Sequence, residues 1–145
     1  MSNLERRRPS PEQLLKVAEA EQRLLLRGKL KVFLGYASGV GKSFRMFSEG
    51  RRRKERGQDV VVAAVQPHPQ QEVEELVSTF EQIPLLMVHD RPCLDVETIL
   101  KRHPGLCLID GLAYTNPPGR RNRYRWQDVE QILNAGINVI TSVNL

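Results

Sequence analysis

The sequence predicts a three-layer α/β sandwich with a mostly parallel five-stranded sheet, preceded by an N-terminal amphipathic helix. Two observations lead to this fold class. Five short apolar runs alternate with helical segments along the 145 residues. These runs are continuously apolar, which is typical of parallel strands that helices cover on both faces.

The N-terminal segment, residues 1–10, is polar and basic, and we expect a flexible arm there. Ser10 is the predicted N-cap of a helix, with Pro11 at its first position. Leucines recur among charged residues over residues 11–27, as in an amphipathic helix, and Gly28 ends it. We expect this helix to pack on the outside of the α/β sandwich, so that residues 11–145 form a single domain.

The remaining elements alternate strictly. Strands are predicted at residues 30–34, 59–65, 85–88, 106–109 and 137–143, and helices at 42–56, 70–82, 94–102 and 125–135. The helix at 70–82 places Val73, Leu76, Val77 and Phe80 on one face. Ligands of such sheets bind beyond the carboxyl ends of the strands, so we look for function there.

A glycine-rich turn connects the first strand to the next helix, with the sequence Gly35-Tyr36-Ala37-Ser38-Gly39-Val40-Gly41-Lys42-Ser43. Its glycines allow successive backbone N–H groups to point at an anion, and the helix N-terminus adds partial positive charge. Lys42 is expected to reach the β- and γ-phosphates, and the Ser43 hydroxyl to bind Mg²⁺. The turn is a predicted P-loop of the Walker A type, which indicates a P-loop NTPase-like fold with the phosphates of a nucleotide and Mg²⁺ as ligands.

The predicted nucleotide-binding residues are Gly35, Ser38, Gly39, Val40, Gly41, Lys42, Ser43 and Asp110. Tyr36 departs from the motif, which has glycine at that position, and the alternative is a strand-to-helix turn that binds nothing. Asp110 follows the apolar run 106–109, at the end of a predicted strand beside the turn. We expect it to share the Mg²⁺ with Ser43. Gly111 comes next, so no adjacent carboxylate activates water; we assign no catalytic residue.

Further motifs are spread over the whole chain. They are Arg8-Pro9, Gly28-Lys29-Leu30-Lys31-Val32-Phe33-Leu34-Gly35, Asp59-Val60-Val61-Val62, Asp110-x-Leu112-Ala113-x-Thr115-Asn116-x-Pro118-Gly119, Arg125-Trp126-Gln127-Asp128-Val129-Glu130, Ala135-Gly136-Ile137 and Thr141-x-Val143-Asn144. With the glycine-rich turn, they resemble the N-terminal cytoplasmic domain of the KdpD family. These proteins are the sensor histidine kinases of the bacterial potassium-uptake system.

The resemblance implies an ATP-binding regulatory domain of a two-component system, which tunes signalling to a response regulator. It implies a protein partner: a sensor kinase, a response regulator or a potassium transporter subunit. The family usually has a small residue in place of Tyr36, glutamate in place of Gly111, histidine in place of Tyr114 and glutamate in place of Gln66. These departures argue against catalysis by the domain itself. The kinase core and transmembrane bundle of the family are not found in this chain.

Two other functions stay open. The turn and Asp110 permit an active phosphotransferase or ATPase. The net charge of +5 permits nucleic-acid binding, although no recognition pattern supports it. The longest apolar stretch, residues 60–65, is too short for a membrane span, and no signal peptide is evident, so we expect a cytoplasmic chain.

Several single residues have competing interpretations. The basic run 51–56 is expected to be a solvated helix end. Arg120, Arg121, Arg123 and Arg125 either close over phosphates or contact a partner. Trp126 is expected to anchor its helix in the core, Cys93 and Cys107 to be buried free thiols, and the three histidines to bind no metal.

Overall fold

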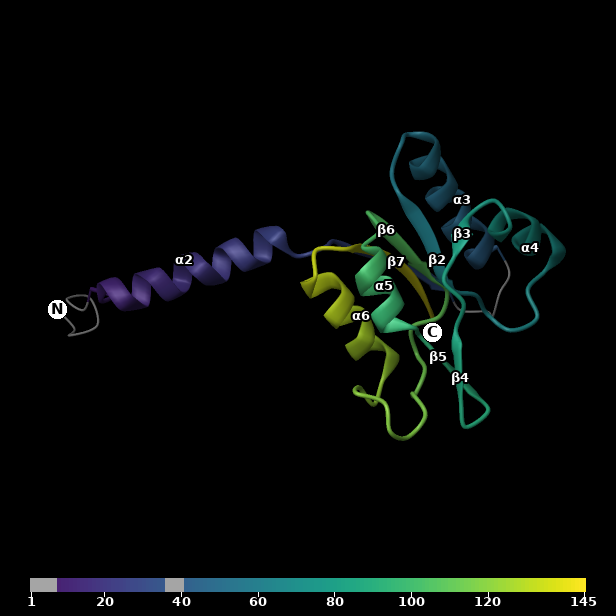
Figure 1. Ribbon diagram of the computed structural model, residues 1–145. Coiled ribbons are helices and arrows are strands. Elements are labelled where there is room, and N and C mark those ends of the chain that lie inside the picture. The colour runs from purple at the N-terminus through teal and green to yellow at the C-terminus, as the bar shows by residue number, and fades with distance from the viewer. Residues whose placement is uncertain (1–7, 36–40) are drawn as a thin grey trace.

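A computed structural model describes residues 8–35 and 41–145 (Figure 1). The main sheet contains β1 (Leu30–Gly35), β2 (Val60–Ala64), β3 (Glu81–Gln82), β6 (Leu106–Ile109) and β7 (Asn138–Asn144). Its strand order is β1-β7-β6-β2-β3, and every pair is parallel. The helices are α2 (Pro11–Leu26), α3 (Lys42–Glu55), α4 (Gln71–Val77), α5 (Val96–Arg102) and α6 (Arg125–Asn134).

Two layers of helices cover the sheet, which confirms the predicted three-layer α/β architecture. Side chains of α3 and α4 form one core with Val60, Val62, Leu106 and Leu108. Side chains of α5 and α6 form the second core on the opposite face, with Val61, Cys107 and Ile109. Every residue of β2 and β6 is buried, as their continuous apolar sequences predict.

Helix α3 packs unusually close to the sheet at Gly50. A Cβ atom at this position would lie 2.4 Å from Leu108 Cδ1 and 3.1 Å from Leu108 Cδ2. The absence of a side chain therefore sets the distance between α3 and β6. This distance matters for the site, because α3 begins with Lys42 and Ser43.

The third predicted strand forms, but the prediction that it belongs to the main sheet is wrong. Residues 86–88 form β4 (Leu86–Val88), which pairs in antiparallel fashion with β5 (Arg91–Cys93) in a separate two-stranded sheet. Both loop residues, His89 and Asp90, have positive φ, as in the tight turns that favour hairpins. The main sheet instead gains the short β3, a few residues earlier in the chain, which pairs with β2.

Helix α4 is shorter than predicted and ends at Val77. The hydroxyls of Ser78 and Thr79 donate hydrogen bonds to the carbonyls of Glu75 and Leu76, at 2.6 and 2.7 Å. Ser and Thr compete for helix carbonyls in this way and favour termination. The apolar face Val73, Leu76, Val77 and Phe80 is buried as expected.

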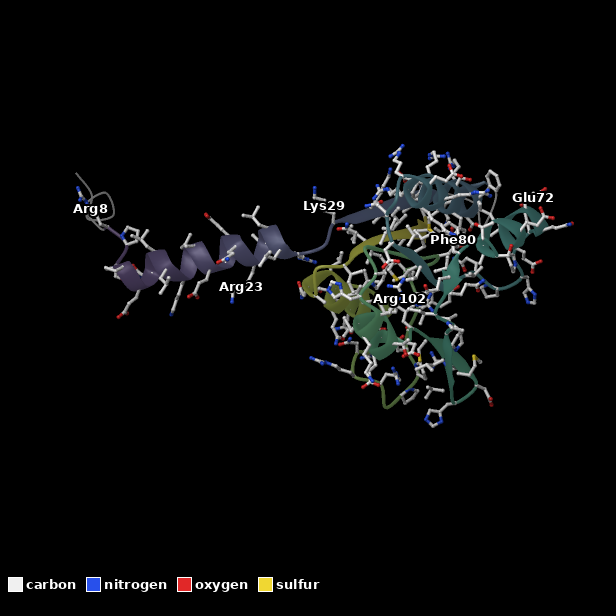
Figure 2. The ribbon with its side chains drawn as sticks, turned by 45° about the horizontal axis from the view of Figure 1, so that its top comes forward. Arg8, Arg23, Lys29, Glu72, Phe80 and Arg102 are labelled. Carbon is white, nitrogen blue, oxygen red and sulfur yellow. The ribbon has the colours of Figure 1, made fainter. Side chains whose placement is uncertain are left out.

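The N-terminal helix begins as predicted but does not pack on the domain. Ser10 Oγ accepts a hydrogen bond from the Gln13 N–H at 3.1 Å, and the Gln13 side chain accepts one from the Ser10 N–H. The helix then extends away from the sheet, and its side chains, Arg23 among them, lie in the open (Figures 1 and 2). No residue of α2 is buried against the described part of the chain. No described helix is long and apolar enough to cross a membrane.

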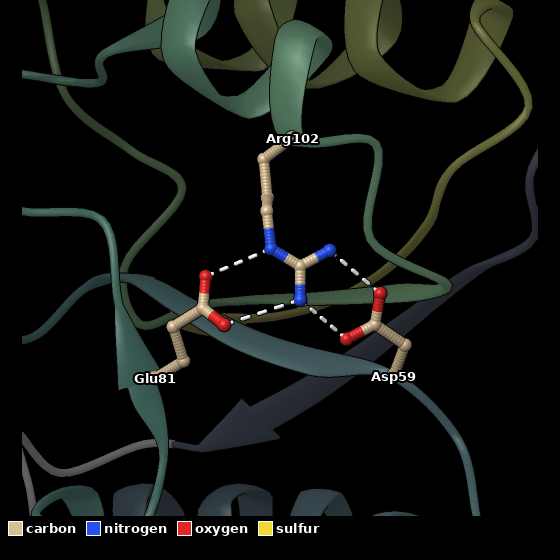
Figure 3. Close-up of polar contacts among 3 residues, drawn as sticks. All are labelled: Asp59, Glu81 and Arg102. Atoms are coloured by element: carbon tan, nitrogen blue, oxygen red, sulfur yellow. Dashed lines mark hydrogen bonds and ion pairs between the residues drawn. The ribbon is translucent and has the colours of Figure 1, made fainter.

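An ion-pair cluster joins α5 to the strand ends farthest from the predicted site. The Arg102 guanidinium lies between two carboxylates (Figure 3). It donates two hydrogen bonds to Asp59, at 2.6 and 2.7 Å, and two to Glu81, at 2.8 and 3.1 Å. Such paired, two-pronged contacts are the strongest form of a surface ion pair.

We expect Arg102→Gln to lower the thermal stability at neutral pH. Hydrogen bonds from Arg102 hold the pKa of Asp59 and of Glu81 below their ordinary values. A carboxyl with a lowered folded-state pKa stabilises the fold above its unfolded pKa, about 4, and loses this effect as the pH falls. The melting difference between wild type and variant should therefore shrink in acid. Lys101→Gln, at the neighbouring exposed position, is the control; a pH-independent difference would contradict the assignment.

Candidate functional site

A pocket of about 250 Å³ lies where the carboxyl ends of β2, β6 and β7 meet the first turn of α3. Ten residues line it: Lys42, Ser43, Gln66, Pro67, His68, Pro69, Gln70, Val73, Asp110 and Asn144. They come from four separate regions of the sequence. Their convergence results from the parallel sheet, which brings all its carboxyl ends to one edge.

Lys42 and Ser43 are the first two residues of α3, and both are buried. The residue before them, Gly41, caps the helix with φ of 75°, a left-handed conformation that glycine adopts without strain. Lys42 is 2% exposed, and its ammonium group donates a hydrogen bond to Asn144 Oδ1 on β7. A buried ammonium beside a helix N-terminus makes this wall of the pocket strongly positive.

Asp110 follows β6 directly and is 1% exposed. Its Oδ1 atom accepts a hydrogen bond of 2.6 Å from the Ser142 hydroxyl. Its Oδ2 atom is buried and has no hydrogen-bond partner among the described residues. A buried acceptor without a partner costs free energy, and a cation or water would remove that cost. The donor set of a hydroxyl and a carboxylate suits Mg²⁺.

Three residues that follow β2 and β6, namely Gln66, Gly111 and Tyr114, lie in contact with one another. Gly111 has φ of 100°, and a Cβ atom there would lie 2.7 Å from both the Gln66 and the Tyr114 side chains. Tyr114 Oη donates a hydrogen bond of 2.6 Å to Gln66 Oε1. A neutral, hydrogen-bonded pair thus fills the space beside Asp110, where a side chain at position 111 would extend.

Arg125 is buried, whereas Trp126 is 50% exposed, so the expectation that Trp126 anchors the helix in the core is wrong. The Arg125 guanidinium donates to the Gly111 carbonyl at 2.9 Å and stacks over the Tyr114 ring at 4.1 Å. Burial lowers the pKa of Arg125. The aromatic contact and the carbonyl compensate for its desolvation, while Trp126 stacks on Tyr124 at the surface.

Asp128 holds the segment between β6 and α6 in place through hydrogen bonds. Its two carboxylate oxygens accept hydrogen bonds from Asn116 at 2.7 Å and from Asn122 at 2.8 Å. Neither Arg120, Arg121, Arg123 nor Arg125 lines the pocket. The described structure therefore does not place these arginines over the predicted phosphate site. The motif residues Asn116 and Asp128 have a structural role in holding this segment.

The structure brings Lys42, Ser43 and Asp110 together in one pocket, as their positions in the sequence predict. Gly35 ends β1 opposite Asn144, and Gly41 caps α3, but neither lines the pocket. Ser38, Gly39 and Val40 lie outside the described residues, as do Tyr36 and the arm residues 1–7. Their predicted roles stay predictions.

Sequence reasoning assigned Lys42, Ser43 and Asp110 to the site and none of the other seven lining residues, among them His68 and Asn144. His68 adopts positive φ in the loop between β2 and α4, and its place in a loop that follows a strand could have indicated a place at the site. Asn144 belongs to the motif Thr141-x-Val143-Asn144, but pairing between the first and last strands was needed to connect it with Lys42.

The two cysteines and the other two histidines do not line the pocket. Cys93 and Cys107 are buried free thiols, as predicted, and burial raises the pKa of Cys107 to about 12. His89 lies in the hairpin turn, and His103 ends α5 with a ring nitrogen 3.0 Å from the Ala135 carbonyl. Among the described residues, no group of three His, Cys, Asp or Glu side chains is arranged to hold a metal.

Comparison with known proteins gives consistent matches. The model of the family described as "Osmosensitive K+ channel His kinase sensor domain" matches residues 26–145. The sensor protein KdpD of Mycobacterium tuberculosis is 50% identical over 123 residues, 82% of this chain and 14% of that protein. The sensor protein KdpD of Escherichia coli K12 is 40% identical over 147 residues, 99% of this chain and 16% of that protein.

A third relative, the sensor protein KdpD of Clostridium acetobutylicum, is 39% identical over 142 residues, 95% of this chain and 16% of that protein. The chain therefore spans about one sixth or less of the length of these curated relatives. The similarity covers the pocket residues and both helical layers.

Proposed function

Because this chain belongs to the KdpD family of osmosensitive K+ channel His kinase sensor domains, we propose that it is an ATP-binding regulatory domain. It binds Mg·ATP with little or no hydrolysis. Through this binding it regulates a two-component system that responds to potassium supply. Its protein partners are a sensor kinase, a response regulator or a subunit of a potassium transporter.

The observation that carries the proposal is the convergence of a buried ammonium and a buried carboxylate on one pocket. Lys42 supplies the positive charge that attracts phosphate, and the helix N-terminus behind it adds to that charge. Asp110 supplies an oxygen for a cation in the same pocket. Phosphates and a divalent cation together satisfy both groups, whereas either ligand alone leaves one of them uncompensated.

The residues present fit Mg²⁺. Ser43 and Asp110 are oxygen donors that line the same pocket, and Mg²⁺ in nucleotide sites is held by one or two protein oxygens plus phosphates and water. When bound there, Mg²⁺ would neutralise part of the negative charge of the phosphates. The chain's own contribution is to hold the Asp110 carboxylate in place, which the Ser142 hydroxyl does through its hydrogen bond.

Weak hydrolysis is expected from the surroundings of Asp110. Asp110 is the single carboxylate among the described residues that line the pocket, and we assign it to the cation. The Gln66–Tyr114 pair occupies the space beside it with neutral groups. A positioned base contributes about 10²- to 10⁴-fold to rate; the described lining residues offer no second carboxylate for that role, so we expect slow turnover.

Titration calorimetry of the 145-residue chain with Mg·ATP tests this function. We expect saturable heat and a rise in melting temperature, because a ligand at about 100 times its Kd stabilises the fold by about 2.7 kcal/mol. Neither heat nor a melting shift at millimolar nucleotide would overturn the proposal. Phosphate release well above that of a Lys42→Ala chain would instead establish an active ATPase, with His68 as the first residue to examine as base.

We expect Asp110→Asn to reduce the affinity for Mg·ATP by about tenfold, the lower end of what a hydrogen bond to a charged group contributes. Asparagine keeps an oxygen for the Ser142 hydroxyl and removes the charge that holds the cation. The matched measurement is ATP binding in the presence of a chelator, where the variant should bind at least as tightly as wild type, because a carboxylate without its cation repels the phosphates. Equal loss with and without Mg²⁺ would show that Asp110 acts through the fold and not through the metal.

A further inference from the structure

Strand β1 is the edge of the main sheet, and its outer side has no strand partner among the described residues. The Val139 N–H donates to the Lys29 carbonyl at 3.0 Å, and the Leu145 N–H donates to the Gly35 carbonyl at 2.7 Å. Backbone groups of successive strand residues point to opposite sides, so the odd-numbered residues of β1 face β7. The backbone groups that face outward belong to the even-numbered residues, Leu30, Val32 and Leu34.

This edge lacks most of the features that protect edge strands. Strand β1 contains no proline, and its six residues pair with β7 without a shift of register. Helix α2 precedes β1, but it extends away from the sheet and buries none of its residues (Figure 1). A regular row of unpaired N–H and C=O groups is a template for a further strand. The edge of β1 is therefore able to accept one.

On the face of the sheet that α3 covers, a groove of about 360 Å³ lies beside β1. Its cationic and aromatic lining residues are Lys31, Phe33, Phe44, Arg45 and Arg52. Glu49 is the one carboxylate among the described lining residues, and it lies 2.6 Å from the Lys31 ammonium. Neither Arg45 nor Arg52 forms an ion pair with a described residue. The groove therefore has an excess of positive charge and suits acidic side chains.

The opposite face of β1 is apolar. Side chains of a strand alternate between the two faces of the sheet, so Leu30, Val32 and Leu34 share the face away from α3. They are 45%, 37% and 58% exposed. A strand added to this edge would thus meet positive charge on one face and aliphatic side chains on the other.

We propose that the outer edge of β1 binds an extended protein segment, from outside these 145 residues, in which acidic and apolar residues alternate. The backbone of the segment pairs with the outward groups of β1. Its acidic side chains lie beside Lys31 and Arg52, and its apolar side chains lie beside Val32. In such strand addition the backbone hydrogen bonds supply affinity and the alternate side chains supply specificity. This binding goes beyond nucleotide binding and does not depend on it.

Two other occupants fit the edge less well. If β1 of a second copy paired with it, the two cationic grooves would lie side by side on one face of the joined sheet, and like charges on neighbouring strands are destabilising. A nucleic acid would pair with the arginines through its phosphates. It would leave the aliphatic row uncovered and would offer no N–H groups at strand spacing to the outward carbonyls.

Calorimetry of the 145-residue chain with synthetic peptides, in buffer without nucleotide, tests the proposal. The probe is an eight-residue peptide in which glutamate alternates with valine, and we expect it to bind with a Kd below about 1 mM. Two matched peptides should bind at least about tenfold more weakly. One has the same composition with glutamates and valines in separate blocks, and the other has lysine in place of glutamate. No binding of the alternating peptide, or equal binding of all three, would overturn the proposal.

Backbone methylation distinguishes strand pairing from charge attraction. One peptide carries N-methyl groups on its glutamates and a second carries them on its valines, so each loses the N–H groups along one edge and keeps every side chain. We expect one of the two to lose binding by at least about tenfold, because a strand pairs with β1 through one edge only. Binding of both like the unmethylated peptide would show that charge alone attracts it, and would contradict strand addition.

Substitutions on α3 locate the bound peptide. Arg52→Gln should weaken the alternating peptide about 2- to 5-fold, the effect of one surface ion pair. Arg51→Gln makes the same change in charge outside the groove and should bind as wild type. Lys42→Ala should also bind as wild type, so a failure of the nucleotide site and a failure of strand addition are distinguishable. Equal weakening by Arg51→Gln and Arg52→Gln would contradict the groove.

The competing occupants are tested in the same titration. We expect the affinity for the alternating peptide to be independent of chain concentration and unaffected by a short single-stranded DNA. Loss of peptide binding at high chain concentration would show that a second copy takes the edge. Displacement of the peptide by the DNA would show a nucleic-acid surface. Either result would overturn the proposal.

Discussion

Lys42→Ala is expected to lower the affinity of the chain for Mg·ATP by about 10- to 150-fold. Lys42 is 2% exposed, and no other lysine or arginine among the described residues that line the pocket can replace its ammonium group. A hydrogen bond between charged groups contributes about 1.5–3 kcal/mol, which corresponds to this range of affinity. Calorimetric titration of wild type and variant measures the difference directly.

Two further variants separate the loss of charge from damage to the fold. Lys42→Met keeps the apolar part of the side chain and should bind as weakly as Lys42→Ala with a melting temperature nearer that of wild type. Lys101→Ala removes the same charge at an exposed position on α5 and should bind normally. Wild-type affinity in Lys42→Met would mean that the ammonium does not contact the phosphates.

Leu108→Ala is expected to reduce the free energy of unfolding by about 2–5 kcal/mol, the range for a fully buried leucine. Leu108 lies in the central part of the sheet, between β2 and β7, and has no exposed surface. Its side chain fills the space beneath Gly50 of α3. Urea denaturation followed by circular dichroism gives the free energy of unfolding and the m-value.

The effect of Gly50→Ala should change sign between the two backgrounds. In the wild type its Cβ atom collides with Leu108 Cδ1 at 2.4 Å, and overpacking of about 1–3 kcal/mol exceeds the helical preference for alanine of about 1 kcal/mol. In the Leu108→Ala chain the collision is absent, and the same substitution should stabilise by about 1 kcal/mol. Equal effects in both backgrounds would show that α3 moves away from the sheet at no cost.

The parts of the fold that the sequence predicts well are those in which local pattern and tertiary environment agree. Strands β2 and β6 are buried on both faces, so their sequences are apolar at every position. Asp110 is recognisable because an acidic residue directly after such a strand must lie at the carboxyl edge of the sheet. The N-cap at Ser10 is equally local, and it appears as predicted.

The parts of the fold that the sequence predicts poorly depend on tertiary contacts. Strand β3 has two exposed polar residues, Glu81 and Gln82, and no pattern marks it as a strand. The apolar run 85–88 satisfies the strand pattern, but its partner is a hairpin and not the main sheet. No local pattern indicates that Arg125 is buried, because the carbonyl and the aromatic ring that compensate its charge are distant in sequence.

The candidate site shows the same division. Lys42 and Ser43 follow from a local motif, and Asp110 follows from the strand before it. Asn144 joins the site through strand order, because β7 lies between β1 and β6 although it comes last in the chain. Gln66 and Tyr114 are recognisable in the sequence as departures from the family pattern, but their hydrogen bond across the missing side chain of Gly111 is visible only in the structure.

The insertion of β7 between β1 and β6 has a consequence for biosynthesis. Of the five strands of this sheet, β1 is translated first, and it has no neighbour in the sheet until residues 138–144 have been translated. The pocket, which is lined by Lys42 of α3 and Asn144 of β7, is therefore incomplete until this segment has been translated. Nascent chains arrested before that point expose the side of β6 that β7 later covers, and chaperones would have their longest opportunity to bind there.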